Sequence, residues 1–334
     1  MNNNTLSSAE NDIKLYTLEQ LKEKYNISES FFRRYFEQNA LNRFGTSSLK
    51  FMWFKEGTFL NPIKKNNYID NFIKDEILDF YENKSLVMPQ IEFCITTKCS
   101  LKCKDCNALI PRFNKLQHID MSVDEFCLNL DKLCNSVDMI RHFTLLGGEP
   151  LLHPNFAKIL EYTCQKDNIF LIKIITNGTI IPSKDIIDVV NKYRTKVYFY
   201  ISNYGVNEKL QKLLKHNEII SLLKQNNIRY QIVDNWEWYR ECGFADKKFA
   251  PEHVQKNFYK CCRTQCLQLL NSKIDICSKA STARETGMLN LDDYIDITDN
   301  NLRQKLIDFY QKPYQQACEY CILSNESVLP ALQD

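Results

Sequence analysis

Three cysteines near position 100 have the residue type and spacing of a metal-binding loop. Cys99, Cys103 and Cys106 form a C-x3-C-x2-C run, in which each gap is short enough for the chain to fold back and bring three thiolates to one inorganic centre. A closed zinc site needs a fourth ligand, and no His or Cys follows at zinc-finger spacing. A [4Fe–4S] cluster held by three cysteines instead leaves one iron open to a small molecule. The run therefore favours an open iron–sulfur cluster over structural zinc with a distant fourth ligand.

Glycines and polar residues directly follow three later apolar runs in the sequence. The segments are Gly147-Gly148-Glu149-Pro150, Thr176-Asn177-Gly178 and Ser202-Asn203-Tyr204-Gly205. Glycine lets a backbone approach a ligand closely, and a carboxylate can accept hydrogen bonds from an ammonium group. Since ligands of parallel α/β proteins bind at the carboxyl ends of the strands, we expect these segments and the cysteine run to face one ligand site.

A second group of cysteines lies in the C-terminal part of the chain. Its members are Cys261, Cys262, Cys266, Cys277, Cys318 and Cys321. The closing C-x2-C pair, Cys277 and one of the three earlier cysteines make a set of four ligands. Four thiolates suit either zinc or an iron–sulfur cluster. The residues therefore predict a second metal site, with a zinc knuckle that stabilises a small tail as the alternative.

The elements that must position these motifs are short apolar runs alternating with amphipathic stretches. The expected strands are 89–96, 140–146, 169–176, 196–202 and 228–234. The expected helices between them lie near 122–135, 154–166, 184–193 and 207–226. Strand-then-helix repetition predicts a parallel sheet with helices on its outer face. A sixth strand would fall within 235–260, where the pattern does not place it.

The N-terminal part of the chain has a different, helical pattern. Residues 17–36 alternate apolar and charged side chains, with Thr17 as a candidate N-cap and a break near Asn26, and a second helix is expected over 68–81. The two short helices resemble a helix-turn-helix, but the run at 31–36 is as aromatic as it is basic, which favours a packing or substrate-recognition role. We expect a helical appendage over 1–86, an α/β core over 87–240 and a cysteine-rich domain over 241–334.

Composition excludes several classes of partner. The chain has 43 basic and 41 acidic residues among 334, so it has no strong field for nucleic acid or an anionic membrane. No uncharged apolar stretch is long enough to span a bilayer, and the first residues lack the features of a signal peptide. We therefore expect a cytoplasmic protein, in which 14 cysteines indicate metal ligands rather than disulfides.

Together the motifs resemble the radical S-adenosylmethionine (SAM) superfamily in their order and approximate spacing, over about 88–235. The resemblance implies a partial (β/α) barrel of roughly five to six strands. It implies that a [4Fe–4S] cluster is ligated by Cys99, Cys103 and Cys106. It further implies that the methionyl amine of SAM is bound by Gly147, Gly148 and Glu149. The rest of SAM is expected near Thr176, Asn177 and Ser202.

One residue departs from the family pattern. The position before the third cysteine, often aromatic in the family and packed near adenine, is Asp105. We therefore expect the adenine contact to differ, while the cluster ligands are unaffected. The activity implied is reductive cleavage of SAM to a 5′-deoxyadenosyl radical, which abstracts hydrogen from a substrate. An electron donor such as flavodoxin or ferredoxin is implied as well.

The C-terminal cysteines are similar to the auxiliary cluster of the twitch extension, a shortened SPASM domain. This resemblance implies a second [4Fe–4S] cluster on Cys261, Cys277, Cys318 and Cys321, with Cys262 or Cys266 as replacements for Cys261. The spacings of Cys261 and Cys262 fit the twitch pattern better than that of Cys266. Ser272 stands where a glycine is expected, and a single closing C-x2-C favours one auxiliary cluster rather than two.

The outcome of the reaction depends on how the substrate radical ends. Transfer of an electron to the auxiliary cluster gives an oxidation, whereas a hydrogen atom from a thiol such as Cys242 gives an epimerisation. Segments around 202–205 and 258–261 look similar to radical SAM proteins of polysaccharide and glycoside biosynthesis, which favours a sugar or sugar-nucleotide substrate. The alternatives are a maturase of a ribosomally synthesised peptide and, remotely, a zinc-stapled DNA-binding protein that uses 17–36.

Overall fold

The central element is one sheet, whose strands come from residues between 87 and 296. The computed structural model describes residues 16–44, 67–234 and 238–333. Eight strands lie side by side in the order β5-β4-β3-β2-β1-β7-β8-β9. The five strands expected from the sequence are β1 (Val87–Thr96), β2 (Met139–Gly147), β3 (Ile169–Thr176), β4 (Val197–Asn203) and β5 (Tyr230–Asp234). Neighbours among these five are all parallel, which confirms the predicted α/β architecture.

The expected position of a sixth strand is wrong. The strand described within 235–260, β6 (Trp238–Tyr239), pairs with β10 (Ser327–Val328) in a separate two-stranded sheet. The sixth parallel strand is β7 (Gln268–Leu270), which lies beside β1 at the opposite end of the barrel sheet. β8 (Lys273–Asp275) and β9 (Ile295–Asp296) extend it in antiparallel fashion. The sheet therefore crosses the domain boundary expected at residue 240. The sequence did not indicate this, because the short β7 pairs with β1 only when the chain has folded.

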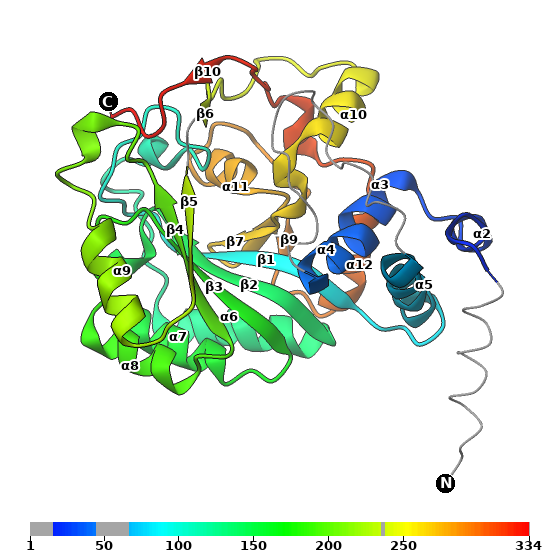
Figure 1. The fold of residues 1–334 in the computed structure, drawn as a ribbon. Helices are drawn as coiled ribbons and strands as arrows, with labels where there is room; N and C mark the ends of the chain where they lie inside the picture. The colour runs from blue at the N-terminus through cyan, green and yellow to red at the C-terminus, as the bar shows by residue number, and fades with distance from the viewer. Residues whose placement is uncertain (1–15, 45–66, 235–237, 334) are drawn as a thin grey trace, which may run out of the picture.

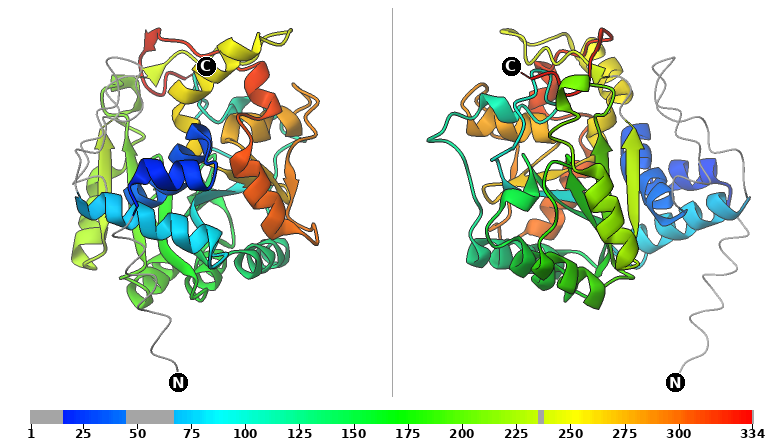
Figure 2. Two further views of the ribbon diagram at one scale, coloured as in Figure 1. Left: turned by 90° about the vertical axis from the view of Figure 1, so that its right-hand side faces the viewer. Right: turned by 60° about the vertical axis from the view of Figure 1, so that its left-hand side comes forward.

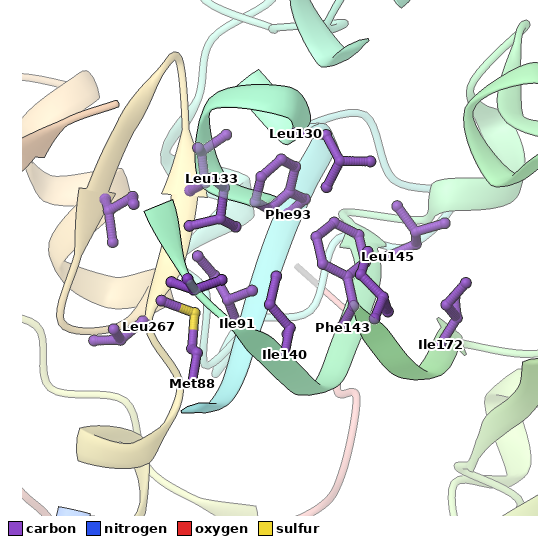
Figure 3. Close-up of a cluster of buried hydrophobic side chains, with 14 of the residues drawn as sticks. Met88, Ile91, Phe93, Leu130, Leu133, Ile140, Phe143, Leu145, Ile172 and Leu267 are labelled. Carbon is purple, nitrogen blue, oxygen red and sulfur yellow. The ribbon is translucent and has the colours of Figure 1, made fainter. Parts of the chain in front are cut away.

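Four helices cover the outer face of the parallel strands (Figure 1). They are α6 (Val123–Ser136), α7 (Phe156–Cys164), α8 (Lys184–Lys192) and α9 (His216–Gln225). Alternate strand residues point toward them: Phe93 and Phe143 lie with ring centroids 4.7 Å apart and pack with Leu130 of α6 (Figure 3). Burial of each such side chain contributes about 1.5–3 kcal/mol. The outer face is thus the hydrophobic core, which leaves the opposite face of the strands for polar side chains.

The N-terminal helices pack against the C-terminal part of the chain (Figures 1 and 2). They are α2 (Leu18–Lys24), α3 (Glu29–Phe31), the π-helix η1 (Phe32–Glu37), α4 (Gln38–Phe44) and α5 (Asn67–Tyr81). Thr17 forms the expected capping box, and Asn26 breaks the helix with a φ of 50°. Tyr35 contacts Tyr310 of α12 (Leu302–Gln311). Because most of the aromatic run at 31–36 is buried, this segment does not present the exposed basic face that DNA binding needs.

The cysteine-rich region contains short elements joined by loops. Its helices are α10 (Pro251–Lys260), η5 (Cys262–Gln265), α11 (Ser278–Glu285) and η6 (Gln316–Glu319). The remaining 3-10 helices of the core are η2 (Ile110–Arg112), η3 (Pro150–Leu152) and η4 (Glu208–Leu210). Across the described ranges, no helix is long and apolar enough to cross a membrane.

Arg34 connects the N-terminal helices to the cysteine-rich region. Its guanidinium is 3% exposed, lies over the rings of Phe258 and Tyr310, and donates to the carbonyl oxygens of residues 264, 310 and 312. We expect Arg34→Ala to lower the free energy of unfolding by about 3 kcal/mol, because buried carbonyls lose a charged donor. The measurement is urea unfolding of the metal-free protein followed by circular dichroism.

The matched control is the neighbouring Arg33, a half-buried residue whose side chain is 39% exposed and pairs with Glu29 at 2.5 Å. Exposed ion pairs of this kind contribute little, so Arg33→Ala should cost less than about 1 kcal/mol. Equal effects of the two substitutions would contradict the structural role assigned to Arg34.

Candidate active site

The three core cysteines lie in the loop that follows β1. Cys103 is buried and Cys99 and Cys106 are half-buried, and all three pack with an apolar group that includes Leu101 and Tyr204. Burial raises the pKa of the Tyr204 phenol, and the three thiols raise it further. All three sulfurs therefore lie within electrostatic reach of one side chain, at the carboxyl end of the sheet as expected.

Burial affects the protonation of two of these thiols. Burial raises the pKa of Cys99 to about 11 and also raises the pKa of Cys106, so the thiolates form only when a bound metal displaces the protons. Among the described residues, no group of three or more His, Cys, Asp or Glu side chains comes close enough to hold one metal ion.

Residues near position 333 lie against the core cysteine loop. The side chain of Gln333 accepts from the backbone N–H of Lys102 at 2.7 Å and donates to the Cys103 sulfur at 3.5 Å. The backbone N–H of Lys104 donates to the carbonyl of Leu332 at 2.7 Å. A cluster on this loop would thus have an amide donor beside one sulfur. The contact joins residues 230 positions apart, and no sequence signal indicated it.

The glycines at the end of β2 allow this strand to pack against the cysteine loop. A Cβ on Gly148 would lie 2.3 Å from the Lys98 carbonyl oxygen and 2.8 Å from the Cys99 Cβ. The backbone N–H groups of Gly148 and Glu149 donate to the carbonyls of Thr96 and Lys98, each at 2.8 Å. Gly148 is therefore required by the close approach of two backbones, whether or not it also contacts SAM.

We expect Gly148→Ala to displace the cysteine loop and to lower SAM cleavage about 100-fold, since small misplacements of reacting groups have effects of this size. The measurement is 5′-deoxyadenosine released by reduced, reconstituted protein, together with iron content. Gly205→Ala is the control, because its Cβ would meet only the end of the Asn203 side chain, at 3.0 Å. Wild-type activity in Gly148→Ala would refute this packing argument.

Glu149 links the ends of β2 and β3. Its carboxylate is fully buried and accepts from the Thr176 hydroxyl at 2.9 Å and from the backbone N–H groups of Asn177 at 2.8 Å and Leu151 at 3.2 Å. Burial raises the pKa of Glu149 to about 7. The predicted contact of Glu149 with the methionyl amine stays a prediction, and the described geometry gives this residue a role in positioning the Thr-Asn-Gly turn.

That turn in turn contacts the cysteine loop. The Asn177 side-chain amide donates to the Ser100 hydroxyl at 3.0 Å and lies 3.7 Å from the Cys99 sulfur. Ser202 lies buried at the end of β4, where its carbonyl oxygen is 3.3 Å from the His216 ring. The fold thus brings the predicted SAM-binding segments of β2 and β3 directly against the cluster loop.

Asp105, the departure from the family pattern, has a structural partner. It is buried, and its Oδ1 accepts from the backbone N–H of Glu241 at 2.9 Å. A carboxylate at this position therefore attaches the cysteine loop to the segment that follows β6. Sequence reasoning identified the substitution but not this contact, because the partner lies 136 residues away.

A polar row crosses the face of the sheet opposite the outer helices. Glu92, Thr144, Lys173 and Tyr198 lie in direct register on β1 to β4, and residues in register on parallel strands point to the same face. Burial raises the pKa of Glu92 to about 7, against the effect of nearby Lys173. Three of the four side chains are half-buried rather than buried. Sequence reasoning missed this row. The available signal was a charged residue, Glu92 or Lys173, within an otherwise apolar strand.

The second group of cysteines surrounds one apolar cavity. Cys261, Cys277, Cys318 and Cys321 all line it, together with residues such as Phe244 and Lys279. Burial raises the pKa of Cys277 to about 12 and that of Cys318 well above its ordinary value, and the neighbouring thiols raise both further. Four thiols that line one cavity suit either zinc or an iron–sulfur cluster.

The two remaining candidates for the fourth ligand differ. Cys266 does not line the cavity: its sulfur accepts from the Gln90 side chain at 3.1 Å, and it hydrogen bonds Glu92 of the polar row. The side chain of Cys262 lies outside the described part of the structure. The arrangement therefore supports Cys261 as the proposed ligand and places Cys266 on the inner face of the sheet.

The thiol predicted as a hydrogen donor, Cys242, is exposed, with its sulfur 3.8 Å from the Arg240 carbonyl oxygen. It follows Glu241, which is buried. Its role stays a prediction.

Comparison with known proteins agrees with the fold and the cysteine loop. Residues 93–248 match the family model described as the radical SAM superfamily. This part of the chain is therefore similar to radical SAM domains, the class of domain that binds a [4Fe–4S] cluster and SAM. The match begins within β1 and ends beyond β6, so it includes the core cysteines, all of the strand ends described above and the Glu241 segment.

Two relatives match part of the chain. The chain is 30% identical over 118 residues to the antilisterial bacteriocin subtilosin biosynthesis protein AlbA of Bacillus subtilis (strain 168), which covers 35% of this chain and 25% of that protein. It is 33% identical over 91 residues to an S-adenosylmethionine-dependent nucleotide dehydratase of Selenomonas ruminantium, covering 27% of this chain and 30% of that protein. The matched segments thus span less than a third of either relative. A solved structure of BtrN with AdoMet and 2-DOIA has a TM-score of 0.42 at 11% identity, over 66% of this chain and 86% of that one.

Proposed function

We propose that this chain is a radical SAM oxidoreductase that oxidises a polar small molecule of the sugar or sugar-nucleotide type. The observation that carries the proposal is the cavity lined by Cys261, Cys277, Cys318 and Cys321. A second cluster at this place gives the enzyme an electron acceptor of its own. An enzyme that only cleaved SAM and returned the hydrogen atom would not need one.

The residues of the core loop fit the first cluster. Cys99, Cys103 and Cys106 would hold it, and Gly147, Gly148, Glu149, Thr176, Asn177 and Ser202 are the proposed SAM contacts. When bound, the cluster and SAM supply hydrogen-atom abstraction through a 5′-deoxyadenosyl radical. The protein's own part is to orient SAM against the loop by the Glu149–Asn177 contacts and to exclude water by packing Tyr204 and Leu101 around the thiols.

The polar row supports a substrate rich in hydroxyl groups. Glu92 and Lys173 lie about three residues, or roughly 10 Å, before the strand ends that face SAM. Carboxylate, ammonium and phenol groups can hydrogen bond sugar hydroxyls from several directions. The nucleotide dehydratase relative, named for a small nucleotide substrate, is consistent with this substrate class.

The proposed oxidation removes two hydrogen equivalents from the substrate in two steps. The substrate loses one hydrogen atom to the 5′ carbon of the deoxyadenosyl group, and the resulting substrate radical loses one electron and one proton. A cluster held by Cys261, Cys277, Cys318 and Cys321 would accept the electron and pass it to a carrier of the flavodoxin or ferredoxin type, and the proton would leave to water. A carbinol carbon would thereby become a carbonyl carbon.

A second candidate function is maturation of a ribosomally made peptide. It is favoured by the 30% identity to a bacteriocin biosynthesis protein. Against it, the aromatic side chains of the N-terminal helices are buried against α5 and α12 and are not available to hold a leader peptide. An epimerase that uses Cys242 as hydrogen donor is a variant of the main proposal.

The deciding experiment is deuterium transfer into 5′-deoxyadenosine from labelled candidates. Anaerobically reconstituted, dithionite-reduced protein is incubated with SAM and deuterated sugar nucleotides or peptides. Transfer from a sugar nucleotide, with a product two mass units lighter than the unlabelled substrate, is expected. Transfer only from peptides would establish the maturase. Solvent deuterium in a product that otherwise has the elemental composition of the substrate would establish the epimerase. Cys242→Ala should then lose that label.

A further inference from the structure

A buried ionic network lies between the two groups of cysteines. Lys279 is 1% exposed and its ammonium pairs with one carboxylate oxygen of Glu241, whose side chain is 3% exposed. Arg263 donates to the other carboxylate oxygen at 3.2 Å. Charged side chains at this depth are costly to bury, and an apolar replacement is often no less stable. Stability alone therefore does not explain why these charges are buried here, and we look for an electrostatic effect on the neighbouring cysteines.

On one side the network forms part of the wall of the four-cysteine cavity. Lys279 and Arg263 both line it. The Lys279 ammonium lies 5.0 Å from the centroid of the Phe244 ring and 3.4 Å from the Ile322 carbonyl oxygen. Two cations and one carboxylate leave this wall with a net positive charge beside four thiols.

On the other side the network attaches to the core cysteine loop. The Glu241 backbone N–H donates to Asp105 at 2.9 Å, and Arg263 also donates to the Asn107 side chain. Asp105 and Asn107 are the two neighbours of Cys106 in the chain. Glu241 thus holds the positive charges at a fixed position between the two sites.

We propose that Lys279, positioned by Glu241, raises the reduction potential of the cluster in the four-cysteine cavity so that this cluster accepts an electron. The inference rests on the proposed function, because it requires a cluster there. A [4Fe–4S] cluster with four thiolate ligands is anionic and gains a further negative charge on reduction. A fixed ammonium inside the low-dielectric protein stabilises the more negative, reduced state.

The test measures the potential of that cluster alone. A background with Cys99, Cys103 and Cys106 all replaced by Ala retains only the C-terminal site, and its midpoint is followed by electron paramagnetic resonance during redox titration. In this background Lys279→Met should lower the ratio of reduced to oxidised cluster about tenfold at the parent midpoint, a shift of about 59 mV for one electron. Lys279→Arg should keep the parent midpoint, since it keeps the charge.

Two further variants make the outcome specific. Lys192→Met, which removes an exposed lysine paired with Glu161 on the outer helices, should leave the midpoint unchanged. Glu241→Gln removes the negative charge and should move the midpoint in the positive direction. If Lys279→Met does not hold a cluster, Glu241→Gln decides the question.

The outcomes separate the two proposals. A Lys279→Met protein with full iron content and the parent midpoint overturns the role of Lys279, and so does a Glu241→Gln midpoint that does not move. If the triple-alanine background contains no iron at all, the auxiliary cluster itself is absent and the proposed oxidoreductase function fails.

Discussion

Cys103→Ala is expected to reduce 5′-deoxyadenosine formation to the background of protein without iron. Cys103 is the most buried of the three core cysteines and accepts a hydrogen bond from the Gln333 amide. Two remaining thiols cannot hold a cluster that needs three, so SAM loses the open iron to which it would bind. The measurement is chromatographic quantification of 5′-deoxyadenosine under dithionite, with iron analysis in parallel.

Cys127→Ala is the matched control, since Cys127 lies on α6 away from the cysteine loop and should leave cleavage unchanged. Iron content is expected to fall from about eight to about four per chain in Cys103→Ala on the two-cluster proposal. SAM cleavage at the wild-type rate in Cys103→Ala would contradict the assignment of Cys99, Cys103 and Cys106 as cluster ligands.

Cys318→Ala is expected to separate SAM cleavage from substrate oxidation. Cys318 is a half-buried member of the four-cysteine cavity, where its pKa is raised by burial and by the neighbouring thiols. Loss of this ligand should remove the second cluster and about four irons. The core site should still cleave SAM, but the substrate radical would have no internal electron acceptor, so oxidised product should fall to background.

The control for this prediction is Cys266→Ala, because Cys266 contacts Gln90 and not the cavity. It should keep about eight irons, whereas Cys261→Ala should behave like Cys318→Ala. Zinc in place of the missing iron in wild-type protein, found by elemental analysis, would establish a structural zinc site and exclude an electron acceptor. Undiminished oxidation by Cys318→Ala would show that the electron leaves by another route.

The strand–helix core was predictable because its signals are local. Each strand from β1 to β4 is a short apolar run followed by an amphipathic helix, and the periodicity of side chains along a segment does not depend on distant residues. The strand bounds differ from the expected ones by two residues at most, whereas the helix expected over 207–226 begins only at residue 216, after the 3-10 helix η4. The Thr17 capping box and the break at Asn26 were likewise encoded within a few neighbouring residues.

The sixth strand was misplaced because β7 has only three residues, and its pairing with β1 joins Glu92 to Gln268. A strand so short has no periodicity to detect, and only the exposed edge of β1 makes it a strand. The same limit applies to the polar row, since its four members become neighbours only when four strands come into register.

The sequence by itself determined which residues could bind metal near position 100, because a C-x3-C-x2-C run is a local ligand set whose spacing already restricts the chemistry. Only the tertiary structure decided that Cys261 rather than Cys266 faces the other cavity thiols, and that Glu241 joins Lys279 to the loop of Cys106. Those choices depend on which side chains meet across long sequence separations. Such contacts are fixed by packing of the whole chain and not by the residues on either side of them.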